Sequence, residues 1–140
     1  MIDLHVHTTV SDGELDPKDV VRRAKEKGVS AIAIADHDAV DGLDEAIEEG
    51  KKIGVEVIPA IELNAKVEKG KMHILGYYMN YKDVDFANKM NLLRKDREDR
   101  NEEFIKEFNK QNINITIEQV KKYAVGNVIA KPHFARALLE

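Results

Sequence analysis

The 140-residue sequence contains no cysteine and no tryptophan. Without cysteine, disulfides and thiolate metal ligands are excluded, so any metal ion must be held by histidine and carboxylate side chains. No apolar run approaches the roughly 20 residues that span a membrane, and no signal peptide precedes the first strand pattern, so we expect a cytoplasmic protein. Gly-x-Gly-x-x-Gly, Gly-Lys-Ser and Gly-x-Ser-x-Gly motifs are also missing, which gives no support to nucleotide cofactors or a serine nucleophile.

The composition is that of a globular chain, with 43% hydrophobic and 34% charged residues. The length suits one domain or part of one. The net charge of -4 provides no basic footprint, so we expect no extended DNA-binding surface. A phosphorylated ligand would therefore need local cations or metal ions to bind its phosphate.

The first eighty residues alternate between strand and helix patterns. Strand patterns cover 2–7, 29–35, 55–61 and 71–78, and helix patterns cover 16–27 and 41–53. Strands that alternate with helices of about a dozen residues are typical of βαβ units, so we expect a parallel sheet.

The pattern changes after Tyr81. Helices are predicted over 84–109, 117–123 and 133–140, and no further strand is predicted. We therefore expect residues 1–81 to form an α/β part and residues 82–140 to form a helical insertion that caps it. The last helix pattern has no stop signal, which indicates a chain truncated after Glu140.

Histidine and carboxylate side chains recur where the strand patterns end. The first strand carries His5 and His7, which project together because they are two residues apart, and Asp12 follows in the next loop. The later strands supply Asp36, His37 and Asp38, then Glu62, then His73. Because functional groups of parallel α/β folds gather at the carboxyl ends of the strands, we expect one metal cluster there.

Taken singly, several of these side chains have a structural explanation. His73 alone would be an edge histidine, and Glu62 alone could cap a helix. Asp36 or Asp38 could cap the helix after Gly42, and we expect at least one of the two only to orient its neighbours. His133, alone in a first helical turn, would be a surface residue.

Four blocks of sequence together carry a specific resemblance. They are His5-Val6-His7-Thr8 with Ser11-Asp12-Gly13, Ala35-Asp36-His37-Asp38, Ile61-Glu62 and His73-Ile74-Leu75-Gly76. In order and spacing they resemble the PHP family, named for polymerase and histidinol phosphatase. The resemblance implies an α/β fold, namely part of a distorted (β/α)7 barrel with a helical insertion.

The resemblance also implies two or three divalent ions per complete site. His5 and His7 would bind a first ion, with Glu62 bridging to another. Asp12 and His37 would bind a second, and His73 with Glu62 a third. Manganese, zinc or iron would suit these ligands, and His5, His7, Asp12, His37 and Glu62 would be the catalytic set. The family takes further ligands from later strands, which this sequence does not contain.

The block Lys131-Pro132-His133-Phe134-Ala135-Arg136-Ala137-Leu138 resembles the helical insertion of stand-alone PHP phosphoesterases. The resemblance implies that His133, with Lys131 or Arg136, contacts the substrate phosphate. Lys131 stands where we expect arginine, which keeps the charge but loses bidentate contact.

The function expected from this resemblance is metal-dependent hydrolysis of a small phosphate ester by metal-activated water. The substrate would be a nucleotide, a nucleoside bisphosphate or a short RNA. Two alternatives stay open: a non-catalytic PHP-like module of a larger protein, and an amidohydrolase-like metal hydrolase. The Ser-Asp-Gly and Asp-His-Asp blocks favour the PHP family over the second alternative.

Overall fold

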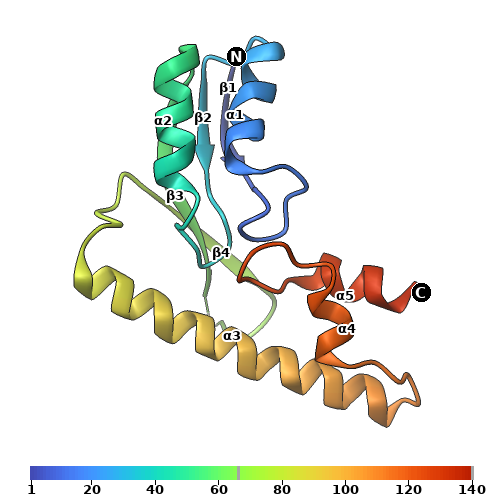
Figure 1. Ribbon diagram of the computed structural model, residues 1–140. Helices are drawn as coiled ribbons and strands as arrows, with labels where there is room; N and C mark the ends of the chain where they lie inside the picture. Colours follow the sequence, from blue (N-terminus) through green and yellow to red (C-terminus); the bar gives the residue numbers. More distant parts are fainter. Residues whose placement is uncertain (66, 140) are drawn as a thin grey trace.

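In the computed structural model, which describes residues 1–65 and 67–139, helices cover one face of a curled four-stranded sheet (Figure 1). The strands are β1 (Ile2–Val6), β2 (Ala31–Ile34), β3 (Glu56–Ala65) and β4 (Met72–Tyr77). The helices are α1 (Pro17–Glu26), α2 (Leu43–Ile53), α3 (Val84–Lys110), α4 (Ile117–Lys121) and α5 (Lys131–Leu138). Within the described ranges, none of these helices has the length and apolar character needed to cross a lipid bilayer.

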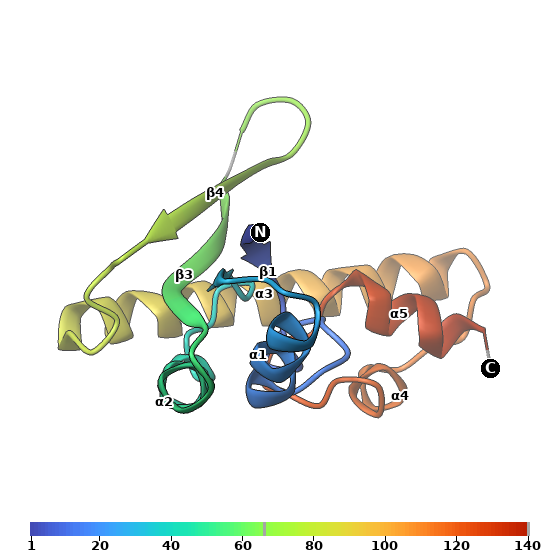
Figure 2. The same ribbon diagram turned by 90° about the horizontal axis from the view of Figure 1, so that it is seen from above.

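Two helices pack on the same face of the sheet because each has one apolar side. Helix α1 begins at Pro17 and buries Val20, Val21 and Ala24, which recur at helical spacing. Helix α2 ends at Gly54, whose φ of 72° is the left-handed conformation that glycine tolerates. Together they cover the central strands, and Figure 2 shows both on one side of the sheet.

The sheet has the order β1-β2-β3-β4. Strands β1, β2 and β3 are parallel, as expected, but β4 runs antiparallel to β3. The expectation of a parallel fourth strand was wrong because the connection from Ala65 to Met72 is too short for a crossover of a dozen or more residues. The amino end of β4 therefore lies beside the carboxyl end of β3.

The sheet curls into part of a barrel. The Tyr77 hydroxyl on β4 donates to the Leu4 carbonyl on β1 over 2.8 Å, although these strands lie at opposite edges. In a flat sheet they would be about 14 Å apart. Apolar side chains on β1 stay exposed, with Ile2 63% and Leu4 46% accessible, which agrees with the mixed α/β half-barrel expected from the resemblance.

The chain from residue 82 onward, called the helical segment below, crosses the carboxyl ends of the parallel strands (Figure 1). Helix α3 is mostly exposed and buries only Met90, Arg97 and Asn101 among its described residues. A small core joins its second half to α4 and α5 around Val120 and Phe134. Helix α4 ends two residues earlier than predicted, α5 begins two residues earlier, and the predicted end at Glu140 lies outside the described residues.

Candidate metal centre

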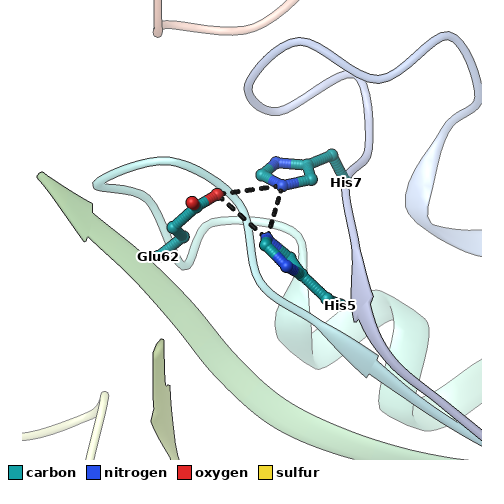
Figure 3. Close-up of side chains that lie close together, drawn as sticks. All are labelled: His5, His7 and Glu62. Carbon is teal, nitrogen blue, oxygen red and sulfur yellow. Dashed lines mark hydrogen bonds and ion pairs between the residues drawn. The ribbon is translucent and has the colours of Figure 1, made fainter. Parts of the chain in front are cut away.

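His5 on β1 and His7, which directly follows the strand, meet one carboxylate. The Nε2 atoms of His5 and His7 lie 3.1 Å apart, and each is 3.0 Å from Oε2 of Glu62 (Figure 3). The strand places both rings on the same side because they are two residues apart. Three electron-pair donors therefore converge on a single point.

Glu62 is the centre of the arrangement and is only 3% exposed. The sequence placed it just after a strand, but it lies inside β3, because pairing with β4 extends that strand to Ala65. Its backbone is fixed on both sides: Glu62 N–H donates to the Asp36 carbonyl, and Asp38 N–H donates to the Glu62 carbonyl. This ladder holds the turn after β2 against β3.

That turn carries His37, which sits between two carboxylates. Its Nε2 lies 3.7 Å from Oδ2 of Asp12, and its Nδ1 lies 3.3 Å from Oε2 of Glu62. The Nδ1 atom is buried, yet it has no hydrogen-bond partner among the described residues. A buried nitrogen without a partner is costly, and it is the kind of atom that a bound cation would satisfy.

His73 reaches the same carboxylate from the opposite direction. It lies near the start of β4, opposite Asn64, and its Nδ1 contacts Oε1 of Glu62. It was expected at the carboxyl end of a strand. Because β4 pairs antiparallel with β3, the beginning of β4 lies beside the carboxyl end of β3 instead. The two oxygens of Glu62 thus face different histidines.

All six predicted ligands come together in three overlapping groups. The groups are His5, His7 and Glu62; His7, Asp12 and His37; and His37, Glu62 and His73. Within each group the candidate ligand atoms lie within 4.8 Å of one another. The mixture of imidazole and carboxylate fits zinc, manganese or iron, so the residues present fit the divalent ions that the fold implies.

The charge states favour cation binding. Burial alone would raise the pKa of Glu62, but hydrogen bonds from His5 and His73 and nearby positive charge outweigh it and lower that pKa. Burial lowers the pKa of His37, against the opposing pull of Asp12 and Glu62. At neutral pH Glu62 is therefore a carboxylate and the neighbouring His37 is a neutral imidazole, and these are the forms that ligate a metal.

A buried carboxylate supports the first loop. Asp36 is 2% exposed and accepts hydrogen bonds from the backbone and hydroxyl of Thr8 and the hydroxyl of Ser11, at 2.6–2.8 Å. Burial raises its pKa, and these hydrogen bonds oppose that rise. The loop also needs Gly13, where a Cβ would lie 2.5 Å from the His7 carbonyl oxygen. Asp36 thus orients the loop, as expected for one of the two aspartates.

The second aspartate binds the helical segment. Asp38 adopts a φ of 50°, unusual for a residue with a side chain, and its carboxylate accepts from Arg97 Nε on α3 at 2.8 Å. Both side chains are almost completely buried. Neither aspartate caps α2, which begins after Gly42 without a side-chain cap, so that expectation was wrong.

The three predicted substrate residues, Lys131, His133 and Arg136, all lie on α5 but have different surroundings. His133 is 4% exposed and not a surface residue, and its Nδ1 accepts from the Ala130 N–H at 3.1 Å. Burial lowers its pKa, while Asp12 acts to raise it. Arg136 pairs with Glu14 at 2.7 Å, beside the small cavity that His133 shares with Asp12. Lys131 opens onto a different cavity.

This second cavity, of about 440 Å³, separates the metal centre from the helical segment. Its lining includes Asp12, His37, Asn64, Lys71, His73, Arg97, Arg100, Phe104, Lys131 and Phe134. Three side chains from the ligand set thus share one space with four cationic side chains.

Sequence reasoning missed several of the residues that shape this region. No local pattern distinguishes Lys71 or Arg100 from other charged residues. Arg97 carried a usable signal, because it occupies a helical position whose neighbours in the pattern are apolar. A cation on the apolar side of a helix predicts a buried carboxylate partner.

Comparison with known proteins identifies the family. The PHP domain model matches residues 3–135. This chain belongs to the PHP domain family. A 5'-3' exoribonuclease of Haemophilus influenzae is 33% identical over 138 residues, covering 99% of the chain and 50% of that protein. A 3',5'-nucleoside bisphosphate phosphatase of Chromobacterium violaceum is 26% identical over 140 residues, with coverages of 99% and 49%.

Solved structures agree with the fold. A structure from Chromobacterium violaceum, described as an amidohydrolase with bound sulfate, superposes with a TM-score of 0.90 and 27% identity. One from Bifidobacterium adolescentis, described as a metal-dependent phosphoesterase, superposes with a TM-score of 0.88 and 30% identity. Each match covers 99% of this chain and 49% of the other. The PHP chain thus spans about half the length of the relatives it matches.

Proposed function

We propose that this PHP chain provides the metal-binding half of a phosphoesterase that hydrolyses a small phosphate ester. The observation that carries the proposal is the convergence of four histidines on Glu62, with Asp12 beside them. Such a cluster has no structural need, because gathering four histidines and a second carboxylate around the buried Glu62 is unfavourable without a bound cation. This argues against a non-catalytic module.

His5, His7 and Glu62 would hold one divalent ion, and the two groups that share His37 would hold others. Divalent ions bound there would lower the pKa of water towards neutrality and offset charge on a phosphoryl group. Asp12 would ligate an ion together with His7 and His37, and it also lines the cavity in which the ester would bind. The roles proposed below for Lys131, His133 and Arg136 are in substrate binding.

The helical segment, residues 82–140, would cap this centre and recognise the substrate. Lys131 lies on the cavity wall and would pair with phosphate oxygens. His133 has its Nδ1 engaged in the helix cap, so only its Nε2 is left for substrate. Arg136 would have to exchange the Glu14 carboxylate for the substrate, and because both side chains are exposed this exchange costs little.

The cavity and the relatives together support a proposed substrate class. A space of about 440 Å³ fits one nucleotide better than a long nucleic acid, and the net charge of -4 gives no extended basic surface. The relatives named above act on RNA and on nucleoside bisphosphates. We therefore propose a nucleotide, a nucleoside bisphosphate or a short RNA as substrate.

The test is phosphate release by the complete protein after chelation and reloading with manganese, zinc or iron. We expect no release from the chelated protein and restored release with at least one metal, from a nucleoside bisphosphate or a short 5'-phosphorylated RNA. Stoichiometric metal binding without turnover of either would instead favour the non-catalytic module. Hydrolysis of amides in place of phosphate esters would favour the amidohydrolase-like alternative.

A further inference from the structure

Ser11 is a buried residue whose hydroxyl lies between a carboxylate and the ring of His7. It is 1% exposed, and its Oγ donates a hydrogen bond to Oδ1 of Asp36 over 2.6 Å. The same Oγ lies 3.3 Å from Nδ1 of His7. The hydroxyl therefore connects the buried Asp36 to a ring whose other nitrogen, Nε2, faces Glu62.

The direction of these two hydrogen bonds follows from the one hydrogen that a serine hydroxyl carries. Oδ1 of Asp36 also accepts from the Thr8 N–H, so it has no hydrogen to give back to Ser11. Oδ1 of Asp12 is the alternative acceptor for the hydroxyl, but it is farther away, at 3.3 Å. The Ser11 hydrogen therefore lies towards Asp36, and its oxygen can only accept from His7. Nδ1 of His7 must then carry a hydrogen.

The position of this hydrogen determines which ring nitrogen of His7 can bind a metal ion. In a neutral imidazole one nitrogen carries the hydrogen and the other has the free electron pair. With the hydrogen on Nδ1, the free pair is on Nε2, the atom 3.0 Å from Oε2 of Glu62 and 3.1 Å from Nε2 of His5. In the opposite tautomer a hydrogen would point at the place where these three donors converge.

We propose that Ser11 is a positioning residue, which accepts the Nδ1 hydrogen of His7 and so keeps the free electron pair of Nε2 directed at the metal centre. Asp36 acts through Ser11, because it holds the hydroxyl in the orientation that accepts. The proposal rests on the proposed function only in treating the ion as catalytic. The tautomer of His7 is a property of the chain without metal.

Nuclear magnetic resonance on the chelated protein tests the tautomer directly. Histidines are labelled with nitrogen-15, and long-range proton–nitrogen correlations are recorded at pH 8.5, above the usual titration range of histidine. The signals lost in His7→Ala identify those of His7. We expect the Nδ1–H form in the wild type, although histidine in water favours the Nε2–H form. A wild-type His7 in the Nε2–H form would overturn the proposal, whether or not any variant folds.

The Ser11→Ala protein separates Ser11 from its neighbour. Oδ1 of Asp12 lies 3.4 Å from Nδ1 of His7 and is a second acceptor for the same hydrogen. We expect the Nε2–H form of His7 to increase when the hydroxyl is removed. A His7 that keeps the Nδ1–H form in Ser11→Ala would assign the role to Asp12 and contradict the proposal.

Zinc binding provides a readout that does not depend on turnover. Zinc is titrated by calorimetry into the chelated wild type, Ser11→Ala and the matched control Thr9→Val, which removes a hydroxyl of the same loop that donates to Asp16 and not to His7. Removing a group that holds a ligating histidine typically weakens metal binding about 10–100-fold. We expect such a loss in Ser11→Ala and wild-type affinity in Thr9→Val. Equal zinc affinity in the two variants would count against Ser11.

The outcomes distinguish this proposal from the proposed function. If the complete, metal-loaded protein hydrolyses no phosphate ester while zinc affinity depends on Ser11 and His7 has the Nδ1–H form, the proposed function fails and the positioning role stands. If esters are hydrolysed while His7 has the Nε2–H form, the proposed function stands and the positioning role fails.

Discussion

The metal centre and the helical segment hold their functional side chains in different ways. At the centre, short side chains project from paired strands and from turns tied to them by backbone hydrogen bonds. In the helical segment, long arginines reach across to the sheet region. These contacts are Arg97 with Asp38, Arg94 with Asp41, and Arg136 with Glu14.

The difference separates a rigid part of the site from an adjustable one. The backbone of β1 and of the residue that follows it fixes the direction of His5 and His7, so the ligand geometry depends on the sheet. Arg136 and Arg94 pair with exposed carboxylates, and such pairs contribute little and exchange easily. Of these three ion pairs, only Arg97–Asp38 is buried. We call this pair the joint between the sheet region and the helical segment.

Replacing a ligand of the rigid part should cost all activity and little stability. His7→Ala removes a side chain that belongs to two of the three ligand groups. We expect phosphate release by the complete, manganese-loaded protein to fall by about 100-fold or more. The thermal midpoint of the metal-free protein should change little, because the ring is half-buried and packs in no apolar core.

His5→Ala is the matched control, because His5 belongs to one group only. The His5→Ala protein should retain more bound metal than the His7→Ala protein, when the metal content of each is measured by elemental mass spectrometry. Unchanged turnover in His7→Ala with manganese present would show that His7 is not a required ligand. The contrast between rigid and adjustable parts would then lose its main support.

Cutting the joint should cost stability. Arg97→Met leaves the buried Asp38 carboxylate without its partner, and breaking one side of a buried ion pair costs about 3–5 kcal/mol. We expect a loss of that size in the free energy of unfolding, measured by urea denaturation. The double variant with Asp38→Asn should recover part of it, because no uncompensated charge remains.

Arg94→Met provides the comparison on the same helix. Its partner Asp41 is 46% exposed at the side chain, so its removal should cost about 1 kcal/mol or less. Equal losses for Arg94→Met and Arg97→Met would mean that Arg97 is not a special joint. The helical segment would then be held to the sheet by its apolar contacts alone.

Much of the sheet region could be predicted from sequence, because its ligands follow the local strand period. His5 and His7 share a face by spacing alone, and His37 follows a continuous apolar strand. The direction of β4 escaped the pattern, since a six-residue strand has the same periodicity in either direction. The short hairpin connection was the available signal, and it also determined where His73 would arrive.

The helical segment was predicted as helices but not as part of a site. Which face of α3 meets the sheet depends on tertiary contacts. The position of Arg97 among apolar residues indicates a buried carboxylate partner, but only the structure identifies that partner as Asp38. Lys71, Arg100 and Lys131 line the same cavity but are far apart in the sequence, so no local pattern brings them together. The assignment of Lys131, His133 and Arg136 to the substrate is still a proposal.

The smallest effect concerns pH. His133 accepts a hydrogen bond at Nδ1 as a helix cap, and burial lowers its pKa below the value of an unfolded histidine. As pH falls through the unfolded value of about 6.5, the unfolded chain takes up the proton first. The free energy of unfolding therefore decreases as the pH falls from about 6.5 to the lower pKa of His133 in the folded protein. It recovers as the pH rises above about 6.5.

His133→Gln isolates this contribution. Glutamine at the third helical position can still accept the Ala130 N–H as a cap, but it does not titrate. The free energy of unfolding of chelated protein is measured at pH 7.5 and 5.5 for both forms. The wild type should lose more stability on acidification than the variant, while the two agree more closely at pH 7.5. All other ionisable residues are the same in both forms, so the difference between the two pH dependences belongs to His133. If that difference is absent, the Nδ1 cap is not part of the folded state, and His133 is as adjustable as Arg136.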